Sequence, residues 1–257
     1  MVVKPVNAIL SIRDLNFSYS DGSRALRNVD LDILSNELFV LFGPSRAGKT
    51  TLLRMLNRLS DLHIDTTRTG TILFHETDIF QRNTNVIKLR RSISMVFATP
   101  TPLPGSIFEN MVYGLKMAGI KRQDELDRRV ETALKQAALW DEVKDRLDRS
   151  AFALSGGQKQ RLCLARSLAL EPEVILLDNP TSGLDPISTT IVEASLAELK
   201  KSYTIIMVPH SVQQAARIAD RAGFLLDGEL VEVGDPAQIF LAPLDQRTED
   251  YVTGRFG

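Results

Sequence analysis

This sequence of 257 residues has only one cysteine and no excess of charge of one sign. The single cysteine, Cys163, excludes an internal disulfide and suits a reducing compartment. The 31 basic and 32 acidic residues leave a net charge of −1, and no long run of one sign occurs. We therefore expect no nucleic-acid partner, because such partners are usually bound by basic patches.

Long hydrophobic runs are also absent. No window reaches the roughly 18 apolar residues of a membrane-spanning helix, and residues 1–10 lack the apolar stretch of a signal peptide. We therefore expect a cytosolic protein whose attachment to a membrane depends on a partner chain. Apolar residues still make up 44% of the sequence, which is enough for a sizeable core in one large domain or two small ones.

The most informative stretch is LFVLFGPSRAGKTTLL, at residues 38–53. Residues 38–42 predict a buried strand, residues 43–50 match the phosphate-binding pattern G-x-x-x-x-G-K-[ST], and leucines then recur at helical spacing. In such a loop, backbone N–H groups and the positive end of the helix face the phosphates. Lys49 can reach the β- and γ-phosphates, and the Thr50 hydroxyl can bind Mg²⁺. The alternative is a chance match in a structural turn.

Two half-buried antiparallel strands are predicted before this loop. Residues 9–17 and 25–33 alternate apolar and polar side chains, and Asp21-Gly22 marks the turn between them. Tyr19 precedes the turn, where it is either an ordinary turn aromatic or a flat surface for a purine base.

The middle of the chain changes in composition at Pro100, Pro102, Pro104 and Gly105, where we place a subdomain boundary. Strands are predicted at residues 70–74 and 92–97 before it, and helices at 107–117 and 126–138 after it.

A second glycine-containing segment, ALSGGQKQRLCLARSLAL, occupies residues 153–170. Ser155 is a favourable N-cap for a helix, and Gly156 and Gly157 leave its entrance open to an approaching phosphate. A plain helix start explains this segment equally well when it is taken alone.

Two further apolar runs end in polar residues. The run at residues 174–177 ends at Asp178, which suits a central parallel strand with an acid at its carboxyl edge and a second Mg²⁺ ligand beside Thr50. Residues 204–208 form another such run, followed by His210, one of three histidines. A helix is predicted at residues 187–200, a last hairpin at 223–233, and a mixed, polar tail at 236–257.

Together these segments resemble the ATP-binding subunit of ABC transporters over nearly the whole chain. The resemblance rests on Tyr19, the loop at 43–50, LSGGQ at 154–158, VILLD at 174–178, SGLD at 182–185 and His210. It implies an α/β fold: a P-loop NTPase (RecA-like) core with an antiparallel β subdomain and an inserted α-helical signature subdomain. The implied single domain covers residues 9–253, with its core at 9–98 and 160–235, its helical subdomain at 99–159 and a C-terminal tail at 236–257.

The resemblance also implies a role for each matched residue. Tyr19 would stack on adenine, Thr50 and Asp178 would hold Mg²⁺, Asp185 would lie at a dimer seam, and His210 would sense the γ-phosphate. The remaining matched residues form two sets. The triphosphate would be held by Gly43, Pro44, Ser45, Arg46, Ala47, Gly48, Lys49, Thr50 and Thr51, and the ATP of a second subunit would be contacted by the signature residues Leu154, Ser155, Gly156, Gly157 and Gln158.

Several segments are similar to the bacterial phosphate-importer branch of this family, above all HSVQQAARIAD and the terminus TEDYVTGRFG. That branch implies a second ATPase subunit, two transmembrane permease subunits contacted by residues 100–119, and indirectly a phosphate-binding protein. It also implies a location at the cytoplasmic face of the plasma membrane.

Three residues depart from the family pattern. Asn179 replaces the glutamate that activates water, and a positioned general base is worth about 10²–10⁴-fold in rate. Ala98 replaces a glutamine that reaches Mg²⁺ and water. Arg46 replaces a glycine, where it either costs about 1–2 kcal/mol if the backbone φ is positive or helps to hold phosphate.

These departures leave two hypotheses. One is a phosphate-import ATPase, slowed by Asn179 and Ala98. The other is a regulatory or degenerate subunit that closes on ATP but hydrolyses little, either alone or paired with an intact ATPase. A DNA-repair or translation ABC protein is disfavoured because the chain has neither a long coiled coil nor tandem ABC domains.

Overall fold

The strand predicted at residues 38–42 lies in the middle of a six-stranded sheet. This computed structural model describes residues 8–255. Most of the segment 1–10, for which the absence of a signal peptide was predicted, and the last two residues of the terminal motif lie outside the described residues. The strand order is β10-β9-β3-β8-β7-β6, with all neighbours parallel except β9 and β10. The strands are β3 (Leu38–Phe42), β6 (Ile93–Val96), β7 (Val174–Asp178), β8 (Thr204–Val208), β9 (Arg221–Leu226) and β10 (Glu229–Gly234).

A separate four-stranded antiparallel sheet has the order β2-β1-β4-β5. The predicted hairpin is confirmed: its two long strands pair antiparallel, and Gly22 takes φ 82° in the connecting turn. β-Bulges shift the register between these two strands. A bulge bends its strand and increases the local twist of the sheet. The strands are β1 (Ala8–Ser18), β2 (Arg24–Leu34), β4 (Thr67–Phe74) and β5 (Thr77–Asp78).

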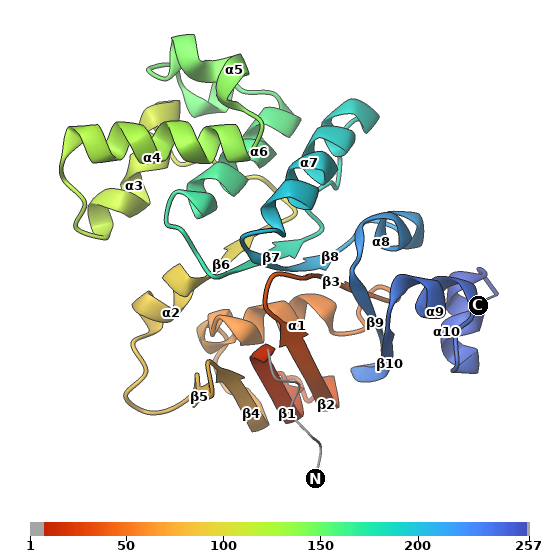
Figure 1. Cartoon of the computed structure of the whole chain (residues 1–257). Coiled ribbons are helices and arrows are strands. Elements are labelled where there is room, and N and C mark those ends of the chain that lie inside the picture. The colour runs from red at the N-terminus through yellow and green to blue at the C-terminus, as the bar shows by residue number, and fades with distance from the viewer. Residues whose placement is uncertain (1–7, 256–257) are drawn as a thin grey trace.

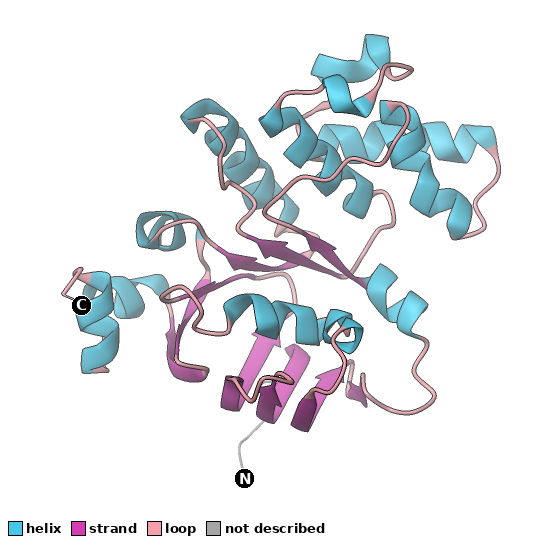
Figure 2. Ribbon diagram, turned by 180° about the vertical axis from the view of Figure 1, so that it is seen from behind, coloured by secondary structure: helices cyan, strands magenta, loops and turns pink. Residues whose placement is uncertain are grey.

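Helix α1 (Lys49–Leu56) lies between the two sheets (Figures 1 and 2). Leu52, Leu53 and Leu56 are buried in a core that also includes Phe39 and Leu41 from alternate positions of β3. Because both faces of α1 meet a sheet, its position is fixed along its whole length.

The other face of the six-stranded sheet is covered by helices that gather at the end of the molecule far from the four-stranded sheet (Figure 1). Their core includes Val40 and Phe42 of β3, so the helical lobe packs directly against this face of the six-stranded sheet. Helix α6 is uninterrupted across residue 160, where the sequence prediction divided the subdomains. The helices are α3 (Ile107–Met117), α4 (Gln123–Gln136), α5 (Trp140–Val143), α6 (Gly156–Leu168) and α7 (Pro186–Leu199).

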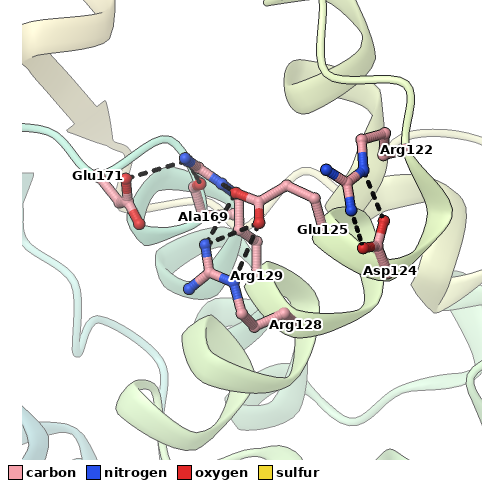
Figure 3. Close-up of polar contacts among 7 residues, drawn as sticks. All are labelled: Arg122, Asp124, Glu125, Arg128, Arg129, Ala169 and Glu171. Atoms are coloured by element: carbon pink, nitrogen blue, oxygen red, sulfur yellow. Dashed lines mark hydrogen bonds and ion pairs between the residues drawn. The ribbon is translucent and has the colours of Figure 1, made fainter.

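An arginine of α4 links that helix to the connection between α6 and β7 (Figure 3). Arg129 of α4 contacts Glu171 at 3.1 Å and donates a hydrogen bond to Ala169 O, at the carboxyl end of α6. Glu125, one turn earlier, accepts a hydrogen bond from Arg129 Nε. The connection from α6 into β7 is therefore tied to α4.

The tail predicted only as mixed and polar contains two short helices, α9 (Pro236–Leu241) and α10 (Gln246–Val252). Each begins after an aspartate N-cap, Asp235 or Asp245, but each is too short to show a helical period in the sequence. Two other short helices are α2 (Val86–Ser92) and α8 (Val212–Ile218). None of the helices within residues 8–255 has the length and apolar composition needed to span a bilayer.

Candidate functional site

The loop of residues 43–48 joins the carboxyl end of β3 to the first residue of α1. A side chain at Gly43 would place Cβ 2.0 Å from Leu225 O, and one at Gly48 would place it 2.2 Å from Ala25 O. Both glycines also have positive φ, of 144° and 103°. The loop therefore requires glycine at these two positions, and it exposes the backbone at the start of α1 to an anionic ligand.

Lys49 lies over this loop. Its Nζ donates hydrogen bonds to Gly43 O at 2.8 Å and to Pro44 O at 2.6 Å. Burial lowers the pKa of Lys49, although the nearby charge of Asp178 opposes that shift. Phosphate oxygens would satisfy this partly desolvated ammonium group better than two neutral carbonyls can, because charge-assisted hydrogen bonds are stronger.

Thr50 and Asp178 meet as the sequence predicts. Thr50 Oγ1 donates to Asp178 Oδ1 across 3.1 Å, and burial raises the pKa of Asp178. No cluster of three or more histidine, cysteine, aspartate or glutamate side chains is found among residues 8–255. One hydroxyl and one carboxylate nevertheless fit Mg²⁺, which binds one or two protein oxygens and takes its other ligands from water and phosphate.

Two cavities flank the loop. One of about 470 Å³ is lined by Tyr19, Arg24 and Thr51, and the other, of about 350 Å³, by Asp178, Asn179 and His210. Lys49 and Thr50 line both. The loop thus stands between a space large enough for a base and ribose and a space beside the residues predicted to act on the γ-phosphate.

Tyr19 lies in the wall of the larger cavity, where a purine-binding residue was predicted. Its hydroxyl is 2.8 Å from Thr51 Oγ1, and its ring packs edge-on against Phe17 and His63. Arg24 also lies in this wall and was not among the predicted site residues. Arg24 gives no sequence signal of its own, because it reaches the site only through the pairing of β2 with β1.

Arg46 has φ 65°, so the backbone at this position does require the left-handed region. An arginine there costs about 1–2 kcal/mol relative to glycine. Its exposed side chain lines both cavities, which places a guanidinium group within the space expected to receive the phosphates.

Asn179 follows β7 and has φ 52°, a conformation that asparagine tolerates better than most residues. Its N–H donates to Val208 O at 2.9 Å, while its Oδ1 is buried and accepts no hydrogen bond from residues 8–255. An amide in this position can bind a water molecule but cannot accept its proton. Ala98, the other departure in the catalytic region, is half-buried and offers only a methyl group.

His210 lies at the same sheet edge as Asp178, as predicted, because β7 and β8 pair in parallel with Asp178 opposite Val208. Its N–H donates to Gln214 Oε1 at 2.8 Å. The buried Gln214 side chain also donates from Nε2 to Thr181 Oγ1 at 3.0 Å and to Glu193 Oε1 at 2.8 Å. Gln214 therefore joins the His210 loop to the loop that follows Asn179. This link was not predicted from the sequence, in which Gln214 appeared only as part of the QQAAR run.

The signature segment, residues 154–158, lies outside the two cavities that flank the loop. Ser155 caps α6 by accepting a hydrogen bond from Gln158 N at 3.3 Å, and Gln158 Oε1 in turn accepts one from Ser155 N at 3.0 Å. The position of Gly156 has open space around it, whereas a Cβ at Gly157 would lie 2.5 Å from Ser188 Oγ. Residues 154–158 line neither of the two cavities described above.

Asp185 connects the signature segment to α7. It caps that helix by accepting from Ser188 N at 2.9 Å and from Ser188 Oγ at 2.6 Å. These hydrogen bonds hold the pKa of Asp185 below its ordinary value. Asp185 is exposed, and its partner Ser188 lies against Gly157, so the starts of α6 and α7 are close together.

Comparisons with known proteins agree with this geometry. The family model described as "ABC transporter" matches residues 26–182. The "Phosphate import ATP-binding protein PstB 1" of Streptococcus agalactiae serotype III is 50% identical over 249 residues, which cover 97% of this chain and 98% of that protein. PstB 2 of Lactiplantibacillus plantarum is 49% identical over 252 residues, covering 98% of this chain and 100% of that protein.

Solved structures show the same architecture. CbiO1 of Clostridium perfringens, part of the ABC transporter complex cbiONQ, has a TM-score of 0.81 and 30% identity, with 97% of each chain covered. The ATP-binding cassette MJ0796, a dimer bound to ADP and Pi after hydrolysis, has a TM-score of 0.76 and 28% identity, covering 88% of this chain and 98% of that one.

The two cavities predict unequal effects of mutation on ATP affinity. Lys49→Ala should weaken ATP binding by at least about tenfold, because it removes a charge-assisted contact to the phosphates. Asn179→Ala should change affinity little, since we expect position 179 to act on the attacking water rather than on the phosphates. Isothermal titration with ATP and Mg²⁺ measures both, and equal losses for the two variants would contradict this division of roles.

Proposed function

Because this chain belongs to the ABC transporter family, we propose that it is the ATP-hydrolysing subunit of an importer of inorganic phosphate. The family membership confirms the predicted ABC ATPase fold. The observation that carries the cargo assignment is about half identity, over nearly the full length of both chains, to phosphate import ATP-binding proteins. No residue of this chain need touch phosphate as cargo.

ATP binding follows from the geometry of the loop. The base and ribose would occupy the cavity beside Tyr19, and the triphosphate would lie along residues 43–51 with Lys49 at its β- and γ-phosphates. Bound Mg²⁺ would neutralise charge on those phosphates, held by Thr50 and Asp178. His210 would donate to the γ-phosphate from the end of β8, and Asn179 would orient the attacking water without removing its proton.

Two subunits are needed to complete each site. The signature residues line neither cavity of their own chain, so the start of α6 is free to face the γ-phosphate held by a second subunit. Asp185 would lie at the seam between the subunits. ATP would close this dimer and hydrolysis would open it, and the two states would drive the change of access in the membrane subunits.

The surface for those membrane subunits would be a cavity of about 330 Å³ next to the helical lobe. It is lined in part by Phe97 and Tyr113, whose side chains are 43% and 58% exposed, and by Leu103 from the proline-rich segment. Exposed aromatic side chains around a cavity are typical of a protein-binding site. Docking of permease subunits here would place the chain at the cytoplasmic face of the plasma membrane, with a phosphate-binding protein on the other side.

A second candidate function is favoured by Asn179 and Ala98. A subunit that closes on ATP but hydrolyses little would regulate transport, or pair with an ATPase that retains the glutamate. The names of the relatives favour the working import ATPase, while the missing general base favours a slow one.

The cargo is tested by reconstitution. Vesicles containing the permease subunits and the phosphate-binding protein should accumulate labelled phosphate when this chain and ATP are present. Lys49→Ala should abolish uptake because it impairs ATP binding. Uptake that is independent of ATP, or that is equally strong for sulfate, would contradict the proposal.

Dimerisation should depend on ATP, because the γ-phosphate supplies the contact for the partner's signature segment. We expect sedimentation velocity to show a dimer with ATP and Mg²⁺ and a monomer without nucleotide. The dimer should persist, since the step that opens it lacks its base. Lys49→Ala is the matched control and should stay monomeric; a monomeric wild-type chain at every ATP concentration would rule out the two-subunit site.

Restoring the glutamate should raise turnover. Asn179→Glu should increase ATP hydrolysis by at most about 10²–10⁴-fold, the contribution of a positioned base. Ala98→Gln should add to the gain, but not independently, because both positions act on one water and one Mg²⁺. Phosphate release assays measure this effect.

Asn179→Asp is the control for that experiment, since it adds a carboxylate with a shorter reach. A glutamate at φ 52° also introduces backbone strain, so the melting temperature of each variant must be compared. Unchanged turnover of folded Asn179→Glu, both alone and in the assembled transporter, would refute the general-base explanation and make His210 the principal catalytic group.

A further inference from the structure

The C-terminal segment folds back onto the sheet that carries the nucleotide loop. Glu232 of β10 accepts hydrogen bonds from Leu244 N at 2.8 Å and from Asp245 N at 3.2 Å, just before α10. Burial alone raises the pKa of Glu232, but these hydrogen bonds outweigh it and hold the pKa below its ordinary value. The start of α10 is thus anchored to β10 by a charged carboxylate.

This anchor directs Tyr251 of α10 towards β3. The Tyr251 ring lies 5.1 Å from the ring of Phe224 and 6.1 Å from that of Phe42, measured between centroids. Phe42 is the last residue before Gly43. A second ring, that of Phe240 on α9, contacts Phe42 from 5.0 Å. Aromatic groups separated by these distances pack favourably, so the helices α9 and α10 support the strand end that begins the loop.

Tyr251, unlike Phe240, also reaches the nucleotide site. It lines the 350 Å³ cavity that contains Lys49 and Asp178, together with Pro209 and Val212 on either side of His210. The ring therefore belongs to the packed cluster at the end of β3 and faces the same cavity as the loop of residues 209–212.

The His210 loop needs such support. Its backbone is held by Gln214, as described above, yet its imidazole forms no hydrogen bond with any residue in the part of the chain that the structure describes. The side chain is exposed at the end of β8.

We infer that Tyr251 is a positioning residue, which packs against the loop of residues 209–212 and holds the His210 imidazole towards the γ-phosphate. The inference rests on the proposed binding of ATP at this site. It assigns a role to a residue of the terminal motif TEDYVTG, which contains none of the residues proposed to bind ATP or Mg²⁺ directly. Tyr251 would act through the contact of His210 with the γ-phosphate, which ADP lacks. Loss of Tyr251 should therefore lower the affinity for ATP and leave the affinity for ADP unchanged.

The test is the ratio of ADP to ATP dissociation constants, measured on the full chain with Mg²⁺. Tyr251→Ala should reduce the preference for ATP by about tenfold, the value of one charge-assisted hydrogen bond, with ADP affinity unchanged. Tyr251→Phe keeps the ring and should behave as the wild type. Phe240→Ala is the matched control, because it removes a ring from the same cluster without lining the cavity: it should lower the melting temperature and leave the ratio unchanged.

A double mutant tests whether Tyr251 acts through His210. His210→Ala should lower the preference for ATP, and adding Tyr251→Ala should lower it no further. If Tyr251→Ala unfolds the protein, Tyr251→Leu retains apolar packing and should show the same loss of preference. A normal ratio in folded Tyr251→Ala or Tyr251→Leu, an equal loss in Tyr251→Phe, or additive effects with His210→Ala would each overturn the inference.

If the proposed function is wrong, the measurements should differ from those that would overturn the role of Tyr251 alone. A wild-type chain that does not bind ATP contradicts nucleotide binding itself, and an unchanged ratio in His210→Ala removes His210 from the γ-phosphate. Either result also overturns the role inferred for Tyr251, whereas a normal wild-type ratio that depends on His210 but not on Tyr251 overturns the inference alone.

Discussion

The close approach of two backbone carbonyls to two glycines is the constraint on which the site depends. Leu225 O of β9 lies where a side chain at Gly43 would begin, and Ala25 O of β2 lies where one at Gly48 would begin. The loop is therefore held at one end by the six-stranded sheet and at the other by the antiparallel sheet. Since α1 is buried between the same two sheets, the phosphate-binding backbone is positioned by both cores at once. A ligand at the loop would consequently add contacts to a surface that is already rigid, which reduces the entropy lost on binding.

The residues around this loop differ in how well they retain their expected chemistry. Lys49, Thr50 and Asp178 form a partly desolvated set with opposed pKa shifts, a state in which phosphate and Mg²⁺ would relieve the burial of charge on both sides. In the proposed function, Asn179 and Ala98 stand where a glutamate and a glutamine would act on water. ATP binding and closure would then depend on residues that match the family pattern, and only the chemical step would depend on residues that depart from it. This division is consistent with an import ATPase that hydrolyses ATP slowly.

The sequence was most informative where a buried strand ends in a functional residue. The strand bounds predicted at 38–42 and 204–208 match those of β3 and β8, because a short apolar run between polar residues leaves few alternatives. The parallel order of β7 and β8 then brings Asp178 and His210 to one edge, as predicted. By contrast, α9 and α10 were missed, since each is held by long-range contacts such as those of Glu232 rather than by its own pattern. Arg24, Gln214 and Tyr251 were missed for the same reason: only the tertiary fold brings them to the loop.

Asn179 and Arg46 show that departures from a family pattern have structural as well as chemical consequences. Both occupy the left-handed region, with φ 52° and 65°. Asparagine adopts that region readily, so its presence relieves strain that a glutamate would introduce, whereas arginine in place of glycine adds strain. The buried Oδ1 of Asn179, which accepts no hydrogen bond from residues 8–255, costs about 1–3 kcal/mol unless a donor reaches it. A water molecule placed for attack on the γ-phosphate is such a donor. In the proposed function the amide would therefore orient water without deprotonating it, so that a substitution at position 179 would change the rate of hydrolysis rather than the affinity for ATP.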